Sequence, residues 1–283
     1  MEYRINKSDI PNDLLAEILQ VLAACYGELQ TEVYVVGAVA RDMALKLHKI
    51  PNIPRGTMDL DVAVALKEWS QFEQLTNKLL QCNFKKAPEK QRFYYRREGM
   101  AFDYLVDIVP FGLIAENEKV AWPPDGSPVM SVKSFDDVMN SADKVVVDNA
   151  FSFRMASLSG QFLIKLDTWC DRHQTTRKDA ADMFFILQNV YVAYALSHDG
   201  LPQEIDIDAE NFDLMVAGAE WIASDLKKIL TDTHRKYYSN LLFEEMEKEE
   251  ESELLNDLLD VSDGRYYVPL CRALKRIAQI LAI

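Results

Sequence analysis

The run MDLDVAVAL at residues 58–66 constrains the fold more than any other segment, because two carboxylates interrupt an apolar, β-branched stretch. Asp59 and Asp61 alternate with apolar residues at the period of a strand. Successive side chains on a strand point to opposite faces, so both carboxylates project from the same side. Two neighbouring anions call for a cation, and carboxylate oxygens favour Mg²⁺ or Mn²⁺. The alternative is an edge strand whose acidic residues keep the protein soluble.

A third carboxylate lies in the apolar run YLVDIVPFG at residues 104–112. Asp107 stands between two apolar residues, where an acidic side chain needs a partner that compensates its charge. If this strand neighbours residues 58–66, the three carboxylates converge, as in two-ion sites for phosphoryl transfer. Asp103 is a rival on the same strand face, but it lies further from the strand end.

A turn of small residues precedes both segments. The apolar run EVYVV at residues 32–36 predicts a short strand, and the residues after Ala38 resume helical spacing. Gly37 and Ala38 would let backbone amides approach a phosphate at the start of that helix. An ordinary strand-to-helix turn is the alternative interpretation.

Taken in order, the segments VVGAVARD, RGTMDLDVAV and YLVDIVPFG resemble the DNA polymerase beta nucleotidyltransferase superfamily. The resemblance implies that Asp59, Asp61 and Asp107 are the catalytic carboxylates and metal ligands, with a nucleoside triphosphate as substrate and Mg²⁺ or Mn²⁺ as cofactor. It implies a small mixed sheet flanked by helices.

The segment VVGAVARD looks particularly like the Gly-Gly-x-x-Arg-Asp element of CCA-adding enzymes. This likeness implies that Gly37, Ala38, Arg41 and Asp42 bind the nucleotide. Ala38 replaces the second glycine, or the serine of other branches, which keeps the backbone donors and removes a hydroxyl.

The segment QFLIKLDTWCDRHQTTRKDAADMFFIL at residues 161–187 is similar to a region of AbiEii-type toxins and related bacterial nucleotidyltransferases. The matching places are occupied by Lys165, Arg172, Lys178, Asp179 and Asp182. On a helix, Lys165 and Arg172 project from nearly one face, as cations that grip a triphosphate would. The alternative is an ion-pair network on the helix surface. The resemblance favours Lys165 as a phosphate contact and Asp182 in a structural or nucleotide-orienting role.

The pattern along the chain predicts strands and helices in residues 1–150 and a mainly helical domain in residues 151–283. With the resemblance, this implies an α+β protein whose first domain is a small mixed nucleotidyltransferase sheet flanked by helices. A loop is expected over residues 49–57, which contain two prolines and a glycine. Other expected elements are helices at residues 11–27, with Asp13 as cap, and 67–80, and strands at 92–97, 101–109 and 144–147.

Charge and composition limit the partners. Thirty-one basic against 45 acidic residues give a formal charge of −14, which disfavours broad nucleic-acid binding. An RNA acceptor would need a local basic rim, and a solvated basic stretch is the alternative. The rim candidates are Lys85, Lys86, Lys90, Arg92, Arg96 and Arg97. The four cysteines form no zinc or disulfide pattern. With no secretory leader or membrane-length apolar run, we expect a soluble, cytoplasmic protein without membrane partners.

The expected activity is transfer of a nucleoside monophosphate to a hydroxyl of RNA such as tRNA, of a protein or of a small molecule. A toxin role is part of this hypothesis, and the sequence leaves open whether an antitoxin partner exists. A second hypothesis is a catalytically weak module that binds nucleotide or a partner, motivated by Ala38. A third is another Asp-x-Asp phosphotransfer or sugar-transfer enzyme, for which Gly37 would have no role.

Overall fold

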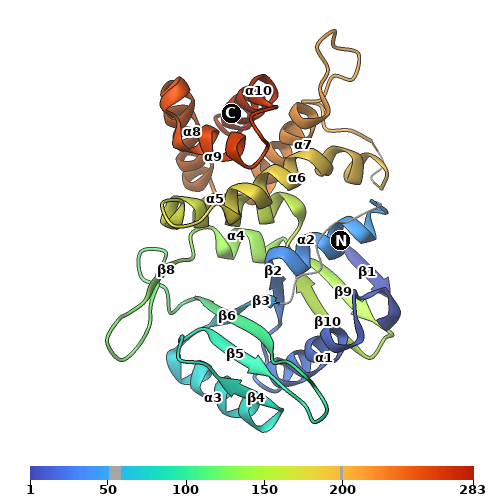
Figure 1. Ribbon diagram of the computed structural model, residues 1–283, viewed down its shortest axis with the longest axis vertical. Coiled ribbons are helices and arrows are strands. Elements are labelled where there is room, and N and C mark those ends of the chain that lie inside the picture. Colours follow the sequence, from blue (N-terminus) through green and yellow to red (C-terminus); the bar gives the residue numbers. More distant parts are fainter. Residues whose placement is uncertain (51–58, 198–199) are drawn as a thin grey trace. The chain divides into compact units, whose positions relative to one another are not determined.

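The computed structural model describes residues 1–50, 59–197 and 200–283 and divides into two compact units (Figure 1). The first comprises the described residues of Met1–Met43 and Pro54–Ser157, and the second those of Ala44–Ile53 and Leu158–Ile283. The predicted loop at residues 49–57 lies outside the described residues from residue 51 onward. The chain is thus a mixed α and β protein, with a mixed sheet in the first unit, as the sequence predicted in outline.

Within the described residues, the first unit contains an eight-stranded sheet, whose strands lie in the order β1-β9-β10-β2-β3-β6-β5-β4. Its strands are β1 (Glu2–Ile5), β2 (Tyr34–Val36), β3 (Asp59–Leu66), β4 (Phe84–Lys86), β5 (Arg92–Tyr95), β6 (Tyr104–Gly112), β9 (Asp143–Val147) and β10 (Phe151–Met155). β3 runs parallel to β6 and antiparallel to β2, and β5 runs antiparallel to both β4 and β6. A separate two-stranded sheet joins β7 (Lys119–Ala121) to β8 (Val129–Ser131).

The predicted boundary near residue 150 falls in the turn between β9 and β10, whereas the contacts of the chain divide it after Ser157. β10 pairs in parallel with β2 and antiparallel with β9, so it lies inside the sheet. The sheet of the first unit therefore needs residues beyond 150 to be continuous.

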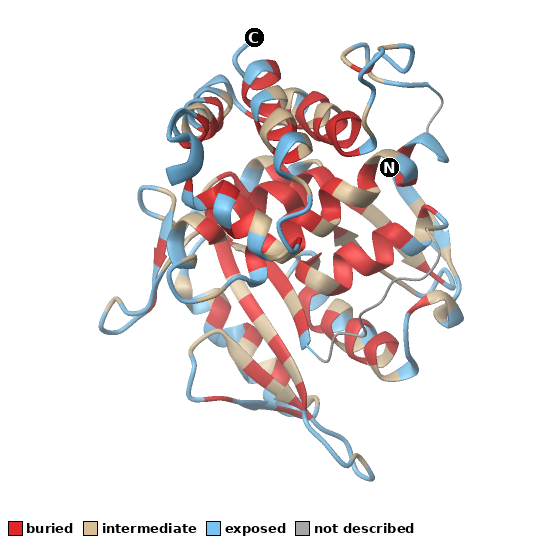
Figure 2. Ribbon diagram, turned by 45° about the horizontal axis from the view of Figure 1, so that its top comes forward, coloured by how far each residue is buried: buried red, intermediate tan, exposed pale blue. Residues whose placement is uncertain are grey.

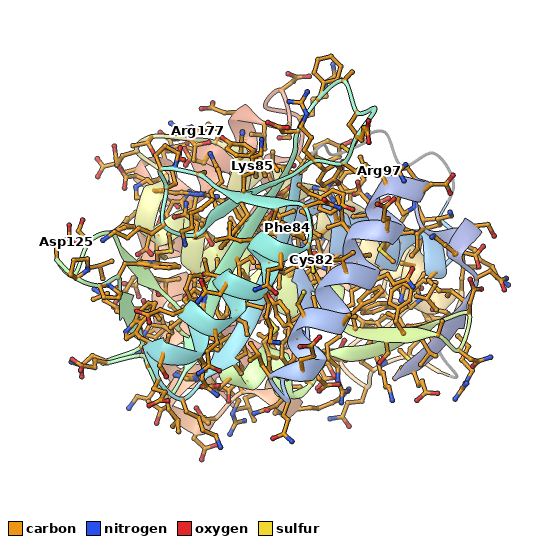
Figure 3. All side chains as sticks on the ribbon, turned by 90° about the horizontal axis from the view of Figure 1, so that it is seen from below. Cys82, Phe84, Lys85, Arg97, Asp125 and Arg177 are labelled. Atoms are coloured by element: carbon orange, nitrogen blue, oxygen red, sulfur yellow. The ribbon has the colours of Figure 1, made fainter. Side chains whose placement is uncertain are left out.

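The helices of the first unit are α1 (Asp13–Glu28), α2 (Gly37–Leu47, whose residues from Ala44 group with the second unit), α3 (Trp69–Gln81) and α4 (Phe135–Asn140), with a 3₁₀ turn, η1 (Lys7–Asp9), before α1. α1 and α3 lie side by side across one face of the sheet (Figure 3). The residues of β3 that face this layer, Leu60, Val62 and Val64, are fully buried. α1 begins after Asn12, whose side chain accepts a hydrogen bond from the Leu15 amide at 2.8 Å. The cap was predicted one residue late, at Asp13.

Along β6, buried residues alternate with half-buried ones, as Figure 2 shows by colour. The half-buried residues, Asp107 among them, lie on one face of β6, and Val106 and Ile108 are buried on the other. Phe111 is the exception on the Asp107 face: it is buried against Tyr34 and Phe135. This alternation separates an apolar layer from a polar face of the same sheet.

The second unit is helical. Its helices are α5 (Leu158–Arg172), α6 (Lys178–Ala195), α7 (Leu214–Ile229), α8 (Asp232–Glu247), α9 (Glu253–Asp260) and α10 (Tyr267–Leu281), with a 3₁₀ turn, η2 (Glu249–Glu251), before α9. α7 packs against α6 and α10, and α10 also packs against α8. Among the helices that the structure describes, none has both the length and the apolar character needed to cross a membrane.

Candidate functional site

Two of the predicted carboxylates lie directly beside one another in the sheet. β3 and β6 are parallel neighbours, and their register sets Asp61 opposite Asp107 and Asp59 opposite Leu105. Paired residues of adjacent strands point to the same face and stand about 5 Å apart, so Asp61 and Asp107 share one side of the sheet. Asp59 is two residues from Asp61 and lies on this side too. Asp103 precedes β6 and pairs with Arg96 at 3.3 Å.

Asp107 has a protein partner for its charge. Arg92 pairs with Asp107 across β5 and β6, and its Nε and Nη2 donate to the two carboxylate oxygens, each at 2.9 Å. This fork geometry is the strongest arrangement for an arginine and a carboxylate. The hydrogen bond to Asp107 raises the pKa of Arg92. The sequence offered Arg92 as one candidate for a basic rim. In the structure it lies beside Asp107, on the side of the sheet that also carries Asp59 and Asp61, which we call the carboxylate face.

The turn at Gly37 lies against Asp61. Val36, the last residue of β2, pairs with Asp61, and Gly37 opens α2 with a φ of 69°. A Cβ atom at Gly37 would stand 2.3 Å from Asp61 Oδ2, closer than any side chain tolerates. Only glycine satisfies both the backbone conformation and the approach of this carboxylate. The first turn of α2 and the Asp-x-Asp strand are therefore one local structure.

Tyr104 belongs to the same region, although the sequence gave it no role. Its side chain is buried, and its hydroxyl has no hydrogen-bond partner in the described part of the chain. Burial and the nearby Asp59 and Asp61 carboxylates raise the pKa of Tyr104 to about 12. The phenol therefore senses the charge of the two aspartates.

The other predicted residues of the α2 turn are directed inward. Arg41 and Asp42 are both buried, and Arg41 Nη2 lies 2.7 Å from Asp42 Oδ1. Ala38 is half-buried at the start of the helix. The arginine and the aspartate thus bind one another within the fold, while Gly37 and Ala38 form the start of α2.

The predicted second cluster forms one ion-pair network between α5 and α6. Lys165 Nζ lies 3.3 Å from Asp179 Oδ1 and 2.7 Å from Asp182 Oδ2. Arg172 donates to both oxygens of Asp179, at 2.7 and 3.0 Å. The Asp179 side chain is only 1% exposed, so its two cations compensate a buried charge. Four of the five residues that the resemblance singles out meet as partners of one another, and Lys178 is not among them. This cluster belongs to the second unit, and the Asp59, Asp61 and Asp107 carboxylates belong to the first.

No family model and no curated protein matches the sequence.

The carboxylate face has the donor chemistry of a magnesium site without a preformed three-ligand geometry. Across residues 1–50, 59–197 and 200–283, no three His, Cys, Asp or Glu side chains are arranged to hold one metal ion. Both oxygens of Asp107 accept hydrogen bonds from Arg92. Asp59 and Asp61 are hard oxygen donors on one strand, and the Asp61 carboxylate lies against Gly37 at the start of α2. The oxygen chemistry of Asp59 and Asp61 thus suits a divalent cation, whereas Asp107, predicted as a third ligand, is not arranged with them as one in the part of the chain that the structure describes.

Proposed function

We propose that this chain is a Mg²⁺-dependent nucleotidyltransferase, which transfers a nucleoside monophosphate from a nucleoside triphosphate to a hydroxyl acceptor. The observation that carries the proposal is the position of Asp61, between the glycine turn of α2 and Asp107 of the adjacent strand. A phosphate-binding turn and a set of carboxylates are the two parts that phosphoryl transfer requires. Here they are adjacent.

In this proposal, Asp59 and Asp61 would hold the cation, which when bound neutralises charge on the triphosphate oxygens. The first turn of α2 presents backbone amides to the phosphates, since a helix N-terminus favours anions. Gly37 leaves room for the Asp61 carboxylate, and Ala38 adds only a methyl group at the start of the helix.

Asp107 then acts on the acceptor. A carboxylate has about four lone-pair positions, so Asp107 can accept a hydroxyl proton while Arg92 holds both of its oxygens. The acceptor oxygen attacks the α-phosphorus in line, the bond from that phosphorus to the bridging oxygen breaks, and pyrophosphate leaves. Arg92 orients the base.

We assign the Lys165 cluster to joining α5 to α6. If Lys165 bound a phosphate, Asp179 and Asp182 would lose a cation that compensates their charge. This loss would be costly because Asp179 is almost fully buried. The ion-pair interpretation therefore agrees better with the contacts than a triphosphate grip.

Labelling in a cell extract tests the activity and identifies the acceptor class. The purified chain is incubated with each α-³²P-labelled triphosphate, Mg²⁺ and whole-cell extract, and labelled RNA, protein and small molecules are separated. Asp61→Asn is expected to lower labelling at least about a hundredfold, the size of effect for loss of a transition-state charge contact. Asp103→Asn is the matched control, because Asp103 lies close to β6 and pairs with Arg96 at the rim. Equal labelling by the Asp61→Asn variant would remove the carboxylates from the mechanism.

The acceptor found in this experiment also decides the toxin proposal. Labelled tRNA or protein supports a toxin, and an antitoxin partner is then sought as a protein that suppresses the labelling. A labelled small molecule, and no labelled macromolecule, argues against a toxin.

A second candidate is a module that binds nucleotide without turnover. The bidentate pair of Arg92 with Asp107 favours it, because a carboxylate held this way is less available as a base. Calorimetry with triphosphate and Mg²⁺, followed by a pyrophosphate-release assay, separates the two. Binding without release supports the module, and release supports the enzyme.

A further inference from the structure

A cavity of about 430 Å³ lies on the face of the sheet opposite the carboxylates. α3 supplies one wall, and the segment after β7 supplies another. Phe93, in contact with α3 through Phe72, pairs with Val106, whereas the adjacent Arg92 pairs with Asp107. Because neighbouring residues on a strand face opposite sides, the sheet separates this cavity from the Asp107 face. The cavity is therefore distinct from the proposed active site.

Three aromatic rings form one wall of the cavity. Trp69 and Trp122 have ring centroids 5.2 Å apart, and Phe72 meets Trp122 edge-on at 5.0 Å. Trp122 and Phe72 are buried, while Trp69 is half-buried and so has ring surface accessible from the cavity. Such a wall suits a planar, apolar surface.

A cation without a carboxylate partner lies beside these rings. The Lys86 ammonium is 4.9 Å from the Phe72 ring centroid and 4.6 Å from that of Phe93, and it makes no salt bridge to any described carboxylate. Lys90, which also lines the cavity, instead binds Asp125 in the β7–β8 loop, labelled in Figure 3, and the Pro123 carbonyl oxygen. Lys86 is thus positioned to receive an anion.

Hydrogen-bonding groups complete the lining. Glu73, Thr76 and Asn77 lie on one side of α3, three and four residues apart, and their side chains make no hydrogen bond within the described residues. The Trp122 indole N–H is buried and, in the described part of the chain, lacks an acceptor. Buried donors without a partner are rare in folded proteins. Glu73, Thr76 and Asn77 offer both donors and acceptors to a ligand.

We propose that this cavity binds a mononucleotide. A nucleotide has three chemical parts, and the lining has a counterpart for each: aromatic rings for the base face, Glu73 and Asn77 for the base edge, and Lys86 for the phosphate. The cavity volume is in the range of small-molecule sites. A single nucleotide also agrees better with the net charge of −14 than a nucleic-acid strand does. The site lies outside the proposed active site and does not depend on its activity.

Isothermal titration calorimetry with AMP, GMP, CMP and UMP, in EDTA, tests the proposal. EDTA removes divalent cations, so the carboxylate face contributes no metal-dependent binding. We expect at least one mononucleotide to bind with a Kd below about 1 mM. Adenosine and inorganic phosphate alone are expected to bind more weakly than AMP, because each lacks one of the two anchors.

Lys86→Met is expected to weaken binding about tenfold or more, since it removes a charge-assisted contact and keeps the apolar stem. Lys85→Met is the matched control: Lys85, labelled in Figure 3, is the adjacent residue of β4 and faces the other side of the sheet. Its Kd should stay within about twofold of that of the unaltered protein. Asn77→Ala, on an exposed part of α3, is a second variant expected to weaken binding several-fold.

Three results would overturn the proposal: no binding of any of the four mononucleotides at about 1 mM, equal Kd values for the Lys86 and Lys85 variants, or loss of binding in Asp61→Asn. Loss of binding in Asp61→Asn would show that the binding heat comes from the carboxylate face and not from this cavity. A negative labelling experiment would not count against this proposal, because the calorimetry measures mononucleotide binding in the absence of metal.

Discussion

Gly37→Ala tests the local structure on which the proposed active site depends. The substitution places a methyl group 2.3 Å from Asp61 Oδ2 and 3.0 Å from Asp61 Cγ, in a residue whose φ is 69°. Two costs add. The left-handed backbone costs a residue with a Cβ atom about 1–2 kcal/mol, and displacement of the Asp61 carboxylate adds about 1–2 kcal/mol of overpacking. The free energy of unfolding should therefore fall by about 2–4 kcal/mol.

Gly126→Ala separates these two costs. Gly126 has a φ of 73°, but nothing lies within 4 Å of a Cβ atom built there. This variant should lose only about 1–2 kcal/mol, from the backbone alone. Urea unfolding followed by circular dichroism, in EDTA, measures both losses.

A double-mutant cycle isolates the contact with Asp61. In an Asp61→Ala background the carboxylate is absent and the nearest remaining Asp61 atom is Cβ at 3.1 Å, so Gly37→Ala should cost about 1 kcal/mol less there. Equal losses for Gly37→Ala and Gly126→Ala, with additive behaviour in the cycle, would refute the close approach of the turn to Asp61. Full triphosphate transfer by the Gly37→Ala variant would in addition favour an Asp-x-Asp enzyme that does not use the turn.

Three other properties follow from the same face of the sheet and the layer beneath it. Burial, and then the Asp59 and Asp61 carboxylates, raise the pKa of Tyr104 to about 12. Asp59→Asn should therefore lower this pKa, as measured by tyrosinate absorbance against a Tyr104→Phe reference; an unchanged pKa would contradict the proximity of Tyr104 to Asp59. The Arg92–Asp107 pair should show a coupling of about 1–2 kcal/mol in an Arg92→Met/Asp107→Asn cycle, and additive losses would contradict the bidentate contact. Burial raises the pKa of Cys25 to about 12, so alkylation by iodoacetamide at pH 8 should be slower than for an exposed thiol. The folded state keeps this proton longer than the unfolded state, so stability should fall as pH rises from about 9 to about 12, less steeply in Cys25→Ser.

The sequence predicted the elements that carry a strong local pattern. The strand at residues 58–66 alternates carboxylates with apolar residues, and the helix at residues 67–80 has apolar residues at helical spacing; both are present as β3 and α3. The strands expected at residues 92–97 and 101–109 correspond to β5 and β6, which pair antiparallel. The sequence predicts these segments because the spacing of their buried residues can be recognised within a short stretch of chain.

Elements formed by long-range pairing were missed. β1, at residues 2–5, pairs with β9 some 140 residues later, and β10 fills the space between β9 and β2. β4 has only one buried residue, Phe84, so it carries no periodic signal. In such strands the partner determines the structure, and no short window of sequence contains that partner.

The candidate site shows the same division. Strand periodicity puts Asp59 and Asp61 on one face, and nothing local sets the register that brings Asp107 beside Asp61. Arg92 was grouped with five other basic residues, yet its role follows from facing Asp107 across a hairpin. The only sequence signal for it is an arginine in the first strand of a hairpin whose second strand contains an isolated aspartate. The nucleotidyltransferase assignment stays a prediction, tested by the labelling experiment.

The place of β10 between β9 and β2 affects how the chain folds during translation and where it can be truncated. A ribosome releases β2 and β3 long before residue 155, so the growing chain exposes an unpaired strand edge until the hairpin of β9 and β10 emerges. A fragment that stops at residue 150 would keep that edge permanently and should self-associate. Expression of the first unit alone therefore needs its C-terminus placed after Ser157.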